Sequence, residues 1–127
     1  MVKNYLHVKK TNKRGRGVFT KEEIRARTVV EHSPVIVMNA EDRAFIEKTL
    51  LHNYIFAWGP KEKECCIALG LVSLYNHSYS SNCEYIMDFD KNTIQIKAVR
   101  KIKAGEELTI NYNGDWNNQK EIWFEVS

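Results

Sequence analysis

The sequence predicts a mostly β fold made of several small sheets and few short helices. Nine short runs rich in β-branched and aromatic residues, each bounded by turn residues, are typical of strands. The chain contains only two prolines and shows no internal repeat, low-complexity segment or linker. Its 127 residues fit a single domain, so residues 1–127 are expected to form one unit.

The predicted strands follow one another at short intervals. They cover residues 5–8, 17–20, 28–31, 35–38, 54–58, 66–69, 83–88, 93–98 and 107–111. The sequence Asp-Lys-Asn at residues 90–92 suits a hairpin turn, because Asn tolerates left-handed backbone angles. The strands on either side of this turn are therefore expected to pair.

One helix is predicted, directly after the fourth strand. Asn39 can cap its start, and two acidic residues in its first turn complement the helix dipole. Apolar residues between Phe45 and Leu50 fall near one face, and the helix is expected to end near residues 51–52. A shorter helical turn is expected over residues 118–124.

Composition and charge are those of an ordinary globular protein, with 43% hydrophobic and 28% charged residues. A net charge of +3 is too weak to indicate a nucleic-acid partner, and the basic cluster in residues 9–16 fits a solvated hairpin. No apolar run approaches the roughly 20 residues that cross a bilayer. The first residues also lack the apolar stretch of a signal peptide. We therefore expect an intracellular protein without membrane contact, in either cytoplasm or nucleus.

The cysteine pattern favours free thiols. Cys65, Cys66 and Cys83 are odd in number, and they lack the CxxC spacing of a zinc site. Free thiols fit a reducing compartment, and no metal site is expected.

Three polar segments carry the functional signal. The first is Arg-Gly-Arg-Gly-Val-Phe at residues 14–19, where glycines let the backbone turn tightly and approach a ligand closely. The second, residues 73–85, contains Asn-His-Ser and is dense in hydrogen-bonding side chains. The third, residues 104–112, is a turn followed by a strand that ends in Tyr112. Taken singly, these segments are a turn, a polar loop and a β-hairpin.

Together, in this order and spacing, the segments resemble the SET domain of protein-lysine methyltransferases. The likeness rests on GxG before a hydrophobic-aromatic pair, on Asn-His-Ser with Asn82 four residues after the Ser, and on Gly-Glu-Glu-Leu-Thr-x-x-Tyr. It extends over about residues 9–123 and is closest to compact bacterial and viral members. Family members often have Pro where Ser81 stands. No cysteine-rich zinc element before or after the domain is expected.

The resemblance implies a SET-domain fold of the β-clip type. This fold has a knot-like crossing of its C-terminal part, which is unusual among proteins and brings Tyr112 beside Asn76. The domain core is expected over about residues 9–113, and a closing segment over residues 114–127.

The resemblance further implies an S-adenosylmethionine-dependent protein-lysine N-methyltransferase, with S-adenosylhomocysteine as product and no metal. The cofactor carries the difficult chemistry, and the protein supplies orientation and electrostatics. The site residues implied by position are Tyr112 for catalysis, Arg16, Gly17, Asn76, His77, Tyr112 and Trp123 for the cofactor, and Tyr54 and Tyr85 for the lysine channel.

Two other functions stay open from the residues alone. A catalytically silent SET-like binding module would lack Tyr112, Asn76 or His77, all of which are present. A small basic nucleic-acid-binding β domain would need exposed aromatics interleaved with basic residues on one surface. The expected partner is a protein with a target lysine, with a histone or histone-like protein among the candidates and no direct nucleic-acid contact. A monomer or weak homodimer is expected.

Overall fold

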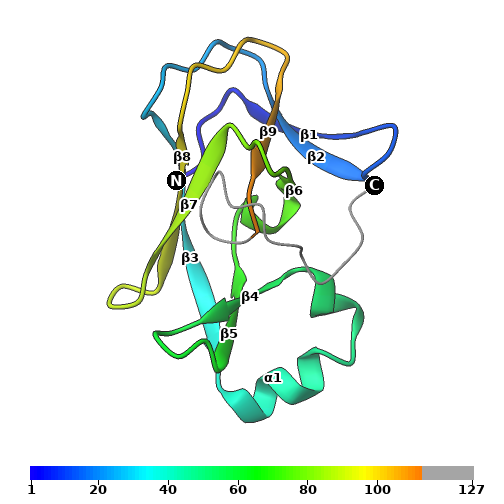
Figure 1. Ribbon diagram of the computed structural model, residues 1–127, viewed down its shortest axis with the longest axis vertical. Helices are drawn as coiled ribbons and strands as arrows, with labels where there is room; N and C mark the ends of the chain where they lie inside the picture. The colour runs from blue at the N-terminus through cyan, green and yellow to red at the C-terminus, as the bar shows by residue number, and fades with distance from the viewer. Residues whose placement is uncertain (113–127) are drawn as a thin grey trace.

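Two β-sheets form the framework of the described chain, which confirms the mostly β prediction (Figure 1). The structure is a computed structural model, and it describes residues 1–112. One sheet has four strands in the order β1-β2-β9-β6, and the other has five in the order β4-β5-β3-β8-β7. In both sheets the strand order differs from the order along the chain, so pairings between distant segments hold the fold together.

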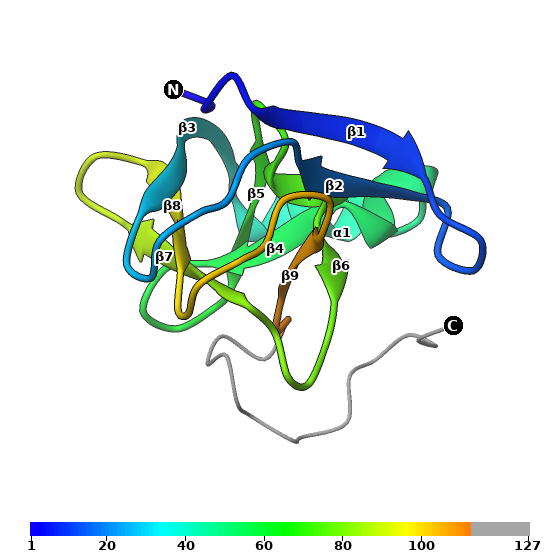
Figure 2. The same cartoon turned by 90° about the horizontal axis from the view of Figure 1, so that it is seen from above.

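The four-stranded sheet collects segments from both ends of the described chain. Strands β1 (Leu6–Lys10) and β2 (Arg16–Thr20) form an antiparallel hairpin, and β9 (Glu107–Ile110) pairs antiparallel with β2. The short strand β6 (Asn76–His77) pairs in parallel with β9. Figure 2 shows the hairpin of β1 and β2 with β9 and β6 next to it. This sheet therefore takes up residues from all three segments singled out in the sequence.

The five-stranded sheet is antiparallel throughout and centres on one long strand. Its strands are β3 (Val29–Met38), β4 (Ile55–Trp58), β5 (Glu64–Ala68), β7 (Cys83–Asp88) and β8 (Thr93–Ala98). The first half of β3 pairs with β8 and the second half pairs with β5. The turn between β7 and β8 is the predicted hairpin, with Asn92 in the left-handed region at φ 53°.

Two predicted strands are a single strand in the structure. Residues 29–31 and 35–38 both belong to β3, because Pro34 between them does not interrupt the strand. Pro34 is the last residue of β3 that pairs with β8, and the next residue pairs with β5. A proline lacks the N–H that a continuous ladder needs, so it is tolerated where the strand changes neighbours.

The predicted helix begins where expected but ends earlier. Helix α1 (Ala40–Ile46) is capped by Asn39, whose side-chain oxygen accepts a backbone N–H of the first turn at 2.8 Å. The chain then starts a separate 3₁₀ helix, η1 (Leu50–Asn53), which the Thr49 hydroxyl caps at 3.2 Å. The expected end near residues 51–52 is therefore wrong, because a second cap redirects the chain.

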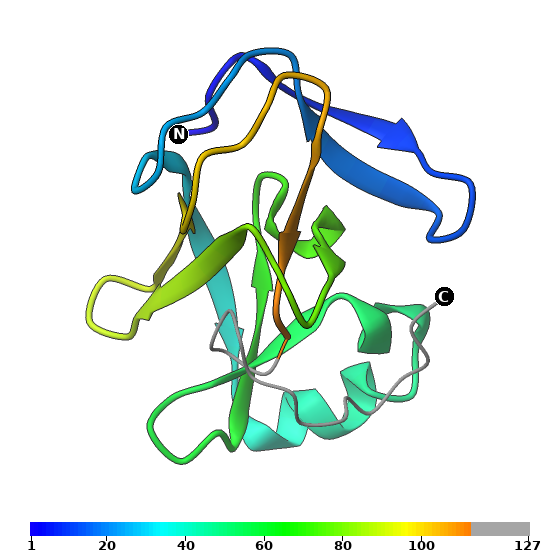
Figure 3. The same ribbon diagram turned by 45° about the horizontal axis from the view of Figure 1, so that its top comes forward.

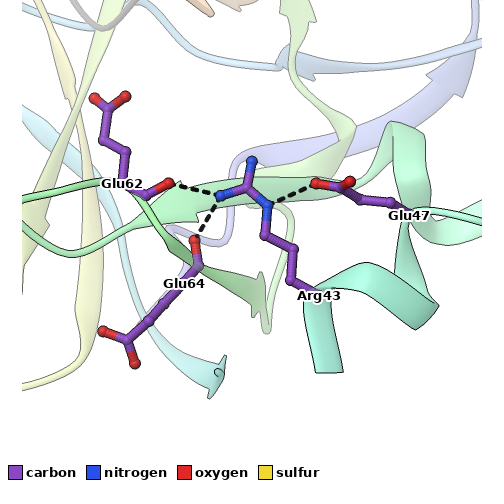
Figure 4. A network of polar contacts seen from close by, with 4 residues as sticks. All are labelled: Arg43, Glu47, Glu62 and Glu64. Atoms are coloured by element: carbon purple, nitrogen blue, oxygen red, sulfur yellow. Dashed lines mark hydrogen bonds and ion pairs between the residues drawn. The ribbon is translucent and has the colours of Figure 1, made fainter. Parts of the chain in front are cut away.

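Helix α1 buries none of its residues, so the apolar positions predicted near one face do not enter the core. Phe45 is 66% exposed. Arg43 ties the helix to β5 and the turn before it (Figure 4). Its guanidinium contacts Glu47 Oε1 at 2.6 Å and donates to the backbone oxygens of Glu62 and Glu64 at 2.7 and 3.1 Å. A charged side chain, rather than apolar burial, makes this connection.

One hydrophobic core joins the two sheets. Its fully buried strand residues include Val18, Leu108 and Ile110 of the smaller sheet and Val30, Ile94 and Ile96 of the larger sheet. Tyr75, directly after the 3₁₀ helix η2 (Val72–Leu74), also has no exposed surface and is the largest fully buried side chain. Burying such side chains contributes roughly 1.5–3 kcal/mol each, so the core fixes how the two sheets meet.

The three cysteines lie in this interior as free thiols. Burial raises the pKa of the Cys66 and Cys83 thiols to about 12, so both stay uncharged and act as small apolar side chains. Within residues 1–112, no helix has the length and apolar composition that crossing a membrane requires. The helical turn predicted at residues 118–124 and the closing segment 114–127 lie outside the described residues.

Candidate active site

Parallel pairing of β6 with β9 brings two of the three polar segments together (Figure 3). Asn76 lies opposite Thr109 and His77 lies opposite Ile110. Tyr112 follows β9 by two residues, and β2 pairs with β9 on its other side. The segments that stand apart in the sequence therefore meet around the end of β9.

Tyr112 is held at both its side chain and its backbone. Its hydroxyl donates to the backbone oxygen of Tyr75 at 2.6 Å, and its N–H donates to His77 Nδ1 at 3.0 Å. Burial, with smaller contributions from Glu107, Tyr54 and Tyr85, raises the pKa of Tyr112 to about 12. The hydroxyl therefore keeps its proton at neutral pH and stays oriented toward the Tyr75 carbonyl.

His77 serves this arrangement as a neutral imidazole. Because Nδ1 accepts the Tyr112 N–H, the hydrogen-bond network assigns the ring proton to Nε2. Burial and the nearby Arg14 guanidinium lower the pKa of His77, which favours this neutral form. The ring lies edge-on to Tyr79, with centroids 4.4 Å apart, and tilted against Tyr112 at 5.1 Å. Among the described residues, Nε2 has no hydrogen-bond acceptor although it is buried.

Asn76 connects the GxG segment with β9. Its Nδ2 donates to Glu107 Oε2 at 2.7 Å and to the backbone oxygen of Arg16 at 3.1 Å. Gly17 is buried against this pair, and a Cβ there would collide with the Glu107 carboxylate and lie 2.9 Å from Asn76 Nδ2. A larger residue at position 17 would therefore displace the Glu107 and Asn76 side chains from their contact. Arg16 contributes its carbonyl, while its side chain is exposed.

Arg14 is a site residue that sequence reasoning did not single out. Its Nη1 donates to the backbone oxygen of His77 at 2.8 Å, which joins the turn before β2 to β6. The only signal in the sequence is its position at the head of the GxG segment. A basic residue in an exposed hairpin gives no indication of a partner so distant in the chain.

Asn82 of the second segment completes the β6–β9 contact. Its Nδ2 donates to the Glu107 backbone oxygen, and its Oδ1 accepts the Thr109 N–H, both at 2.8 Å. The Asn82 amide therefore makes the same two hydrogen bonds to β9 that the backbone of a paired strand would make. Ser81, where family members often have Pro, donates its hydroxyl to the Cys83 backbone oxygen at 2.9 Å. The Arg100 side chain donates to the Ser81 carbonyl at 2.9 Å, so polar contacts hold this loop without the proline.

Tyr54 and Tyr85, the expected channel residues, lie near Tyr112. The Tyr85 hydroxyl donates to the Tyr112 backbone oxygen at 3.2 Å, and its ring packs on Phe56 with centroids 5.4 Å apart. Tyr54 follows η1, and its carbonyl accepts the Ser73 hydroxyl at 2.7 Å. Tyr54 and Tyr85 both lie close enough to Tyr112 to raise its pKa, so tyrosines from three separate segments meet near this phenol.

Two further observations limit the site. Trp123, expected to cover the cofactor, lies outside the described residues. Within residues 1–112, no three His, Cys, Asp or Glu side chains are close enough to hold a metal ion together. The chemistry of the described site is therefore that of carbonyls, a carboxylate, an amide, an imidazole and phenols.

A polar cleft of about 530 Å³ adjoins the site. Its lining residues are Thr11, Asn12, Lys13, Arg14, Ser78, Ser80, Asn82, Arg100, Glu106, Glu107 and Thr109. None of the five described residues expected to bind the cofactor is among them. The cleft shares Arg14, Asn82 and Glu107 with the network just described, so it lies beside the meeting point of the motifs rather than at it.

Comparison with known proteins agrees with the motif pattern. The SET domain family matches residues 15–113 of this chain. A Schizosaccharomyces pombe protein named histone-lysine N-methyltransferase, H3 lysine-37 specific, is 36% identical over 126 residues. That match covers 98% of this chain and 80% of the yeast protein.

Two solved structures share the fold. A Plasmodium falciparum protein described as a candidate histone methyltransferase superposes with a TM-score of 0.68 at 25% identity, covering 91% of this chain and 98% of that one. A humanised mutant of Chaetomium thermophilum Polycomb Repressive Complex 2, bound to an inhibitor, gives a TM-score of 0.73 at 20% identity. The match covers 93% of this chain and 16% of that one. The compact bacterial and viral members expected from the sequence are not among these three relatives, which are all eukaryotic.

Proposed function

Because the chain belongs to the SET-domain family and is a protein-lysine N-methyltransferase, we propose that methyl transfer takes place beside Tyr112. One observation carries this proposal: the Tyr112 hydroxyl lies 2.6 Å from the Tyr75 carbonyl, where the second and third motif segments meet. A phenol fixed in this way is a preorganised polar group, which is what stabilises charge in a transition state.

Enzymes of this family use S-adenosylmethionine, and we propose that Arg16, Gly17, Asn76 and His77 hold it. The cofactor supplies an activated methyl group on a positively charged sulfur. The Arg16 backbone oxygen and the Glu107 carboxylate lie next to Asn76 and Gly17, and such oxygen atoms suit a cationic ligand. Trp123 is proposed to cover the cofactor from the closing segment.

The acceptor lysine must lose its proton before it can attack. Free lysine has a pKa of about 10.4, and burial in an apolar channel lowers the pKa of an amine. We propose that Tyr54 and Tyr85 line that channel together with Tyr112. Solvent can then take the proton, so no strong protein base is needed. Holding the reactants in line contributes roughly 7–11 kcal/mol in well-oriented systems.

Tyr112 has a defined part in this scheme. Its proton is directed at the Tyr75 carbonyl, so the phenol oxygen can turn its electron density toward the partial positive charge on the transferring methyl carbon. His77 holds the Tyr112 backbone in place, because its Nδ1 accepts the Tyr112 N–H. The two contacts fix the position of the oxygen from two directions.

The proposed substrate is a histone or histone-like protein. The yeast relative is named as specific for lysine 37 of histone H3, and the match to it covers 98% of this chain. Histone H3 and peptides around that lysine are therefore the first substrates to test. A monomer or weak homodimer stays a prediction, which light scattering would check.

The test is a single-turnover assay on wild type and Tyr112→Phe. Wild type should bind S-adenosylhomocysteine in calorimetry and transfer labelled methyl to histone lysine. Tyr112→Phe removes one oxygen and at most one net hydrogen bond, so its stability should stay within about 1 kcal/mol and cofactor affinity should change little. Its transfer rate should fall by roughly two to three orders of magnitude.

Each outcome separates the alternatives. A wild-type rate in Tyr112→Phe would remove the catalytic assignment. Loss of cofactor affinity together with rate would make the residue structural. Cofactor binding by wild type with no transfer to any protein would favour a catalytically silent SET-like module. Nucleic-acid binding that weakens steeply with salt, without cofactor binding, would favour the basic β domain.

A further inference from the structure

A fully buried carboxylate lies outside the residues assigned to the site. Glu31 is on β3 and has no exposed surface. Glutamates are almost never fully buried unless they are partnered. Here three donors surround the carboxylate: the Ser33 hydroxyl at 2.7 Å and the Leu71 N–H at 2.8 Å on Oε2, and the Tyr75 hydroxyl at 2.9 Å on Oε1.

The chain is shaped to admit this carboxylate. Gly70, just before the Leu71 amide, has a φ of +76°. A Cβ at this position would collide with Glu31 Oε2 and the Ser33 hydroxyl. Both the left-handed backbone and the missing side chain are therefore needed for the Leu71 N–H to reach Glu31.

Tyr75 connects the buried carboxylate with the active site. Its phenol donates to Glu31, while its own carbonyl accepts the Tyr112 hydroxyl at 2.6 Å. Burial and the adjacent Glu31 raise the pKa of Tyr75 well above its usual value, so the phenol keeps the proton that it donates. Tyr75 also directly precedes Asn76 and His77 of β6. A continuous series of hydrogen bonds thus runs from Glu31 through Tyr75 to Tyr112.

We propose that Glu31 is a positioning residue for methyl transfer, which acts through Tyr75 to fix the carbonyl that orients the Tyr112 hydroxyl. This inference rests on the proposed catalytic role of Tyr112. In this proposal Glu31 and the Tyr75 phenol act through the Tyr75 carbonyl, and their effect is to hold one peptide plane.

The physical reason lies in how a carbonyl direction is set. The Tyr75 carbonyl belongs to the peptide between η2 and β6, and its direction follows the backbone angles of Tyr75. On the N-terminal side of β6, the segment is anchored to Glu31 through the Leu71 N–H and the Tyr75 phenol. Three donors hold the Glu31 side chain at both of its oxygens, and in the interior none of them can exchange it for water, which makes this anchor stiff. A displacement of about 1 Å at a reacting group can cost roughly a hundredfold in rate.

The main test variant is Tyr75→Phe, which removes only the oxygen that contacts Glu31. The rate of single-turnover transfer at saturating cofactor and peptide should fall by about tenfold, because the Tyr112 oxygen loses its fixed orientation. The affinity for S-adenosylhomocysteine and the KM for peptide should stay within about twofold of wild type, since no contact to either is removed. Glu31→Gln gives a second variant of nearly the same shape, with the same expected change in rate.

Ser33→Ala is the matched control. It removes another donor to the same carboxylate, but on Oε2, whereas Tyr75 contacts Oε1. A merely structural role for Glu31 predicts that Ser33→Ala and Tyr75→Phe lower the melting temperature and the rate together. The proposal predicts that Ser33→Ala lowers the melting temperature and leaves the rate within about twofold of wild type.

A double-mutant cycle with Tyr112→Phe completes the test. If the effect passes through the Tyr112 hydroxyl, adding Tyr75→Phe to Tyr112→Phe should cause no further loss of rate. A full additional tenfold loss would overturn the proposal, as would an unchanged rate in Tyr75→Phe and Glu31→Gln. An unchanged rate in Tyr112→Phe alone would instead remove the proposed function on which the inference rests.

Discussion

The Glu31 side chain and the Arg43 guanidinium both connect separate segments of the chain, one in the interior and one on helix α1. Each side chain joins segments that are distant in the sequence by contacting backbone groups. Glu31 is fully buried, whereas the Arg43 side chain on α1 is 28% exposed. The first holds the carbonyl beside Tyr112, and the second holds a helix that buries nothing.

From this difference we expect that burial, rather than the number of contacts, determines how much such a side chain contributes to the free energy of unfolding. When a buried acceptor is removed, its donors lose their partners and cannot reach water, which costs about 1–3 kcal/mol for each donor. When an exposed cation is removed, water replaces it, and the net loss is typically below about 1 kcal/mol. The two regions should therefore respond very differently to equivalent substitutions.

The largest effect on stability is expected for Glu31→Ala. It leaves the Ser33 hydroxyl, the Leu71 N–H and the Tyr75 hydroxyl without their acceptor in the interior. We expect a loss of about 3 kcal/mol or more in the free energy of unfolding, measured by urea denaturation. Ser33→Ala removes a single contact and should cost about 1 kcal/mol. A loss below about 1 kcal/mol for Glu31→Ala would mean that water reaches this region.

A pH-dependent effect is expected at His77, which belongs to the buried region. The pKa of His77 is lowered by burial and by Arg14, so the unfolded chain takes up a proton before the folded protein does. The stability from the neutral ring is fully present above about pH 6.5, the unfolded value, and is lost as the pH falls toward the folded pKa. The melting temperature should therefore decrease between about pH 7 and pH 5.

The control for this prediction separates His77 from the other histidines. His77→Gln should be less stable at neutral pH but should lose part of the decrease toward acid. Equal pH profiles for wild type and His77→Gln would contradict the neutral assignment of this ring.

A smaller effect is expected for Arg43→Met. Its contacts to Glu47, Glu62 and Glu64 are partly hydrated, so the free energy of unfolding should fall by about 1 kcal/mol or less. Added salt should reduce the difference between wild type and variant, because it screens the Glu47 contact. A loss as large as that of Glu31→Ala would show that α1 contributes to the core, against its observed exposure.

The smallest effect is expected for Phe45→Ser. Phe45 is 66% exposed and its helix buries no residue, so the free energy of unfolding should change by less than about 0.5 kcal/mol. Ile94→Ser at a fully buried position provides the contrast and should lower the free energy of unfolding by about 2 kcal/mol. A large loss for Phe45→Ser would indicate that another surface covers α1 in solution.

Helix α1 shows why some elements could be predicted only in part. Its cap at Asn39 involves a side chain and the next few residues, and the sequence indicates it directly. Its exposure depends on where β3 and β5 lie, which no local pattern contains. The strand β3 is a similar case, because Pro34 reads as a break until the change of partner strand is known.

The candidate site divides in the same way. The motif segments identified Tyr112, Asn76 and His77 as site residues, and the structure brings all three together around β9. Glu31 gave no signal and Arg14 gave only its place at the head of the GxG segment, because a carboxylate in a strand and a basic residue in a hairpin are ordinarily exposed. Their partners lie far along the chain and became visible only from the contacts at Tyr75 and at the His77 carbonyl.

By itself, the sequence determined where most strands and turns lie and which segments carry the chemistry. Turn residues, caps and alternating side chains act over a few neighbouring positions, so a short stretch of sequence is enough to predict their effect. Only the tertiary structure decided that the Tyr112 hydroxyl meets the Tyr75 carbonyl and that Tyr75 rests on Glu31. Those contacts depend on the parallel pairing of β6 with β9 and on one shared core. Both are set by the packing of distant segments, which forms only when the whole domain has folded.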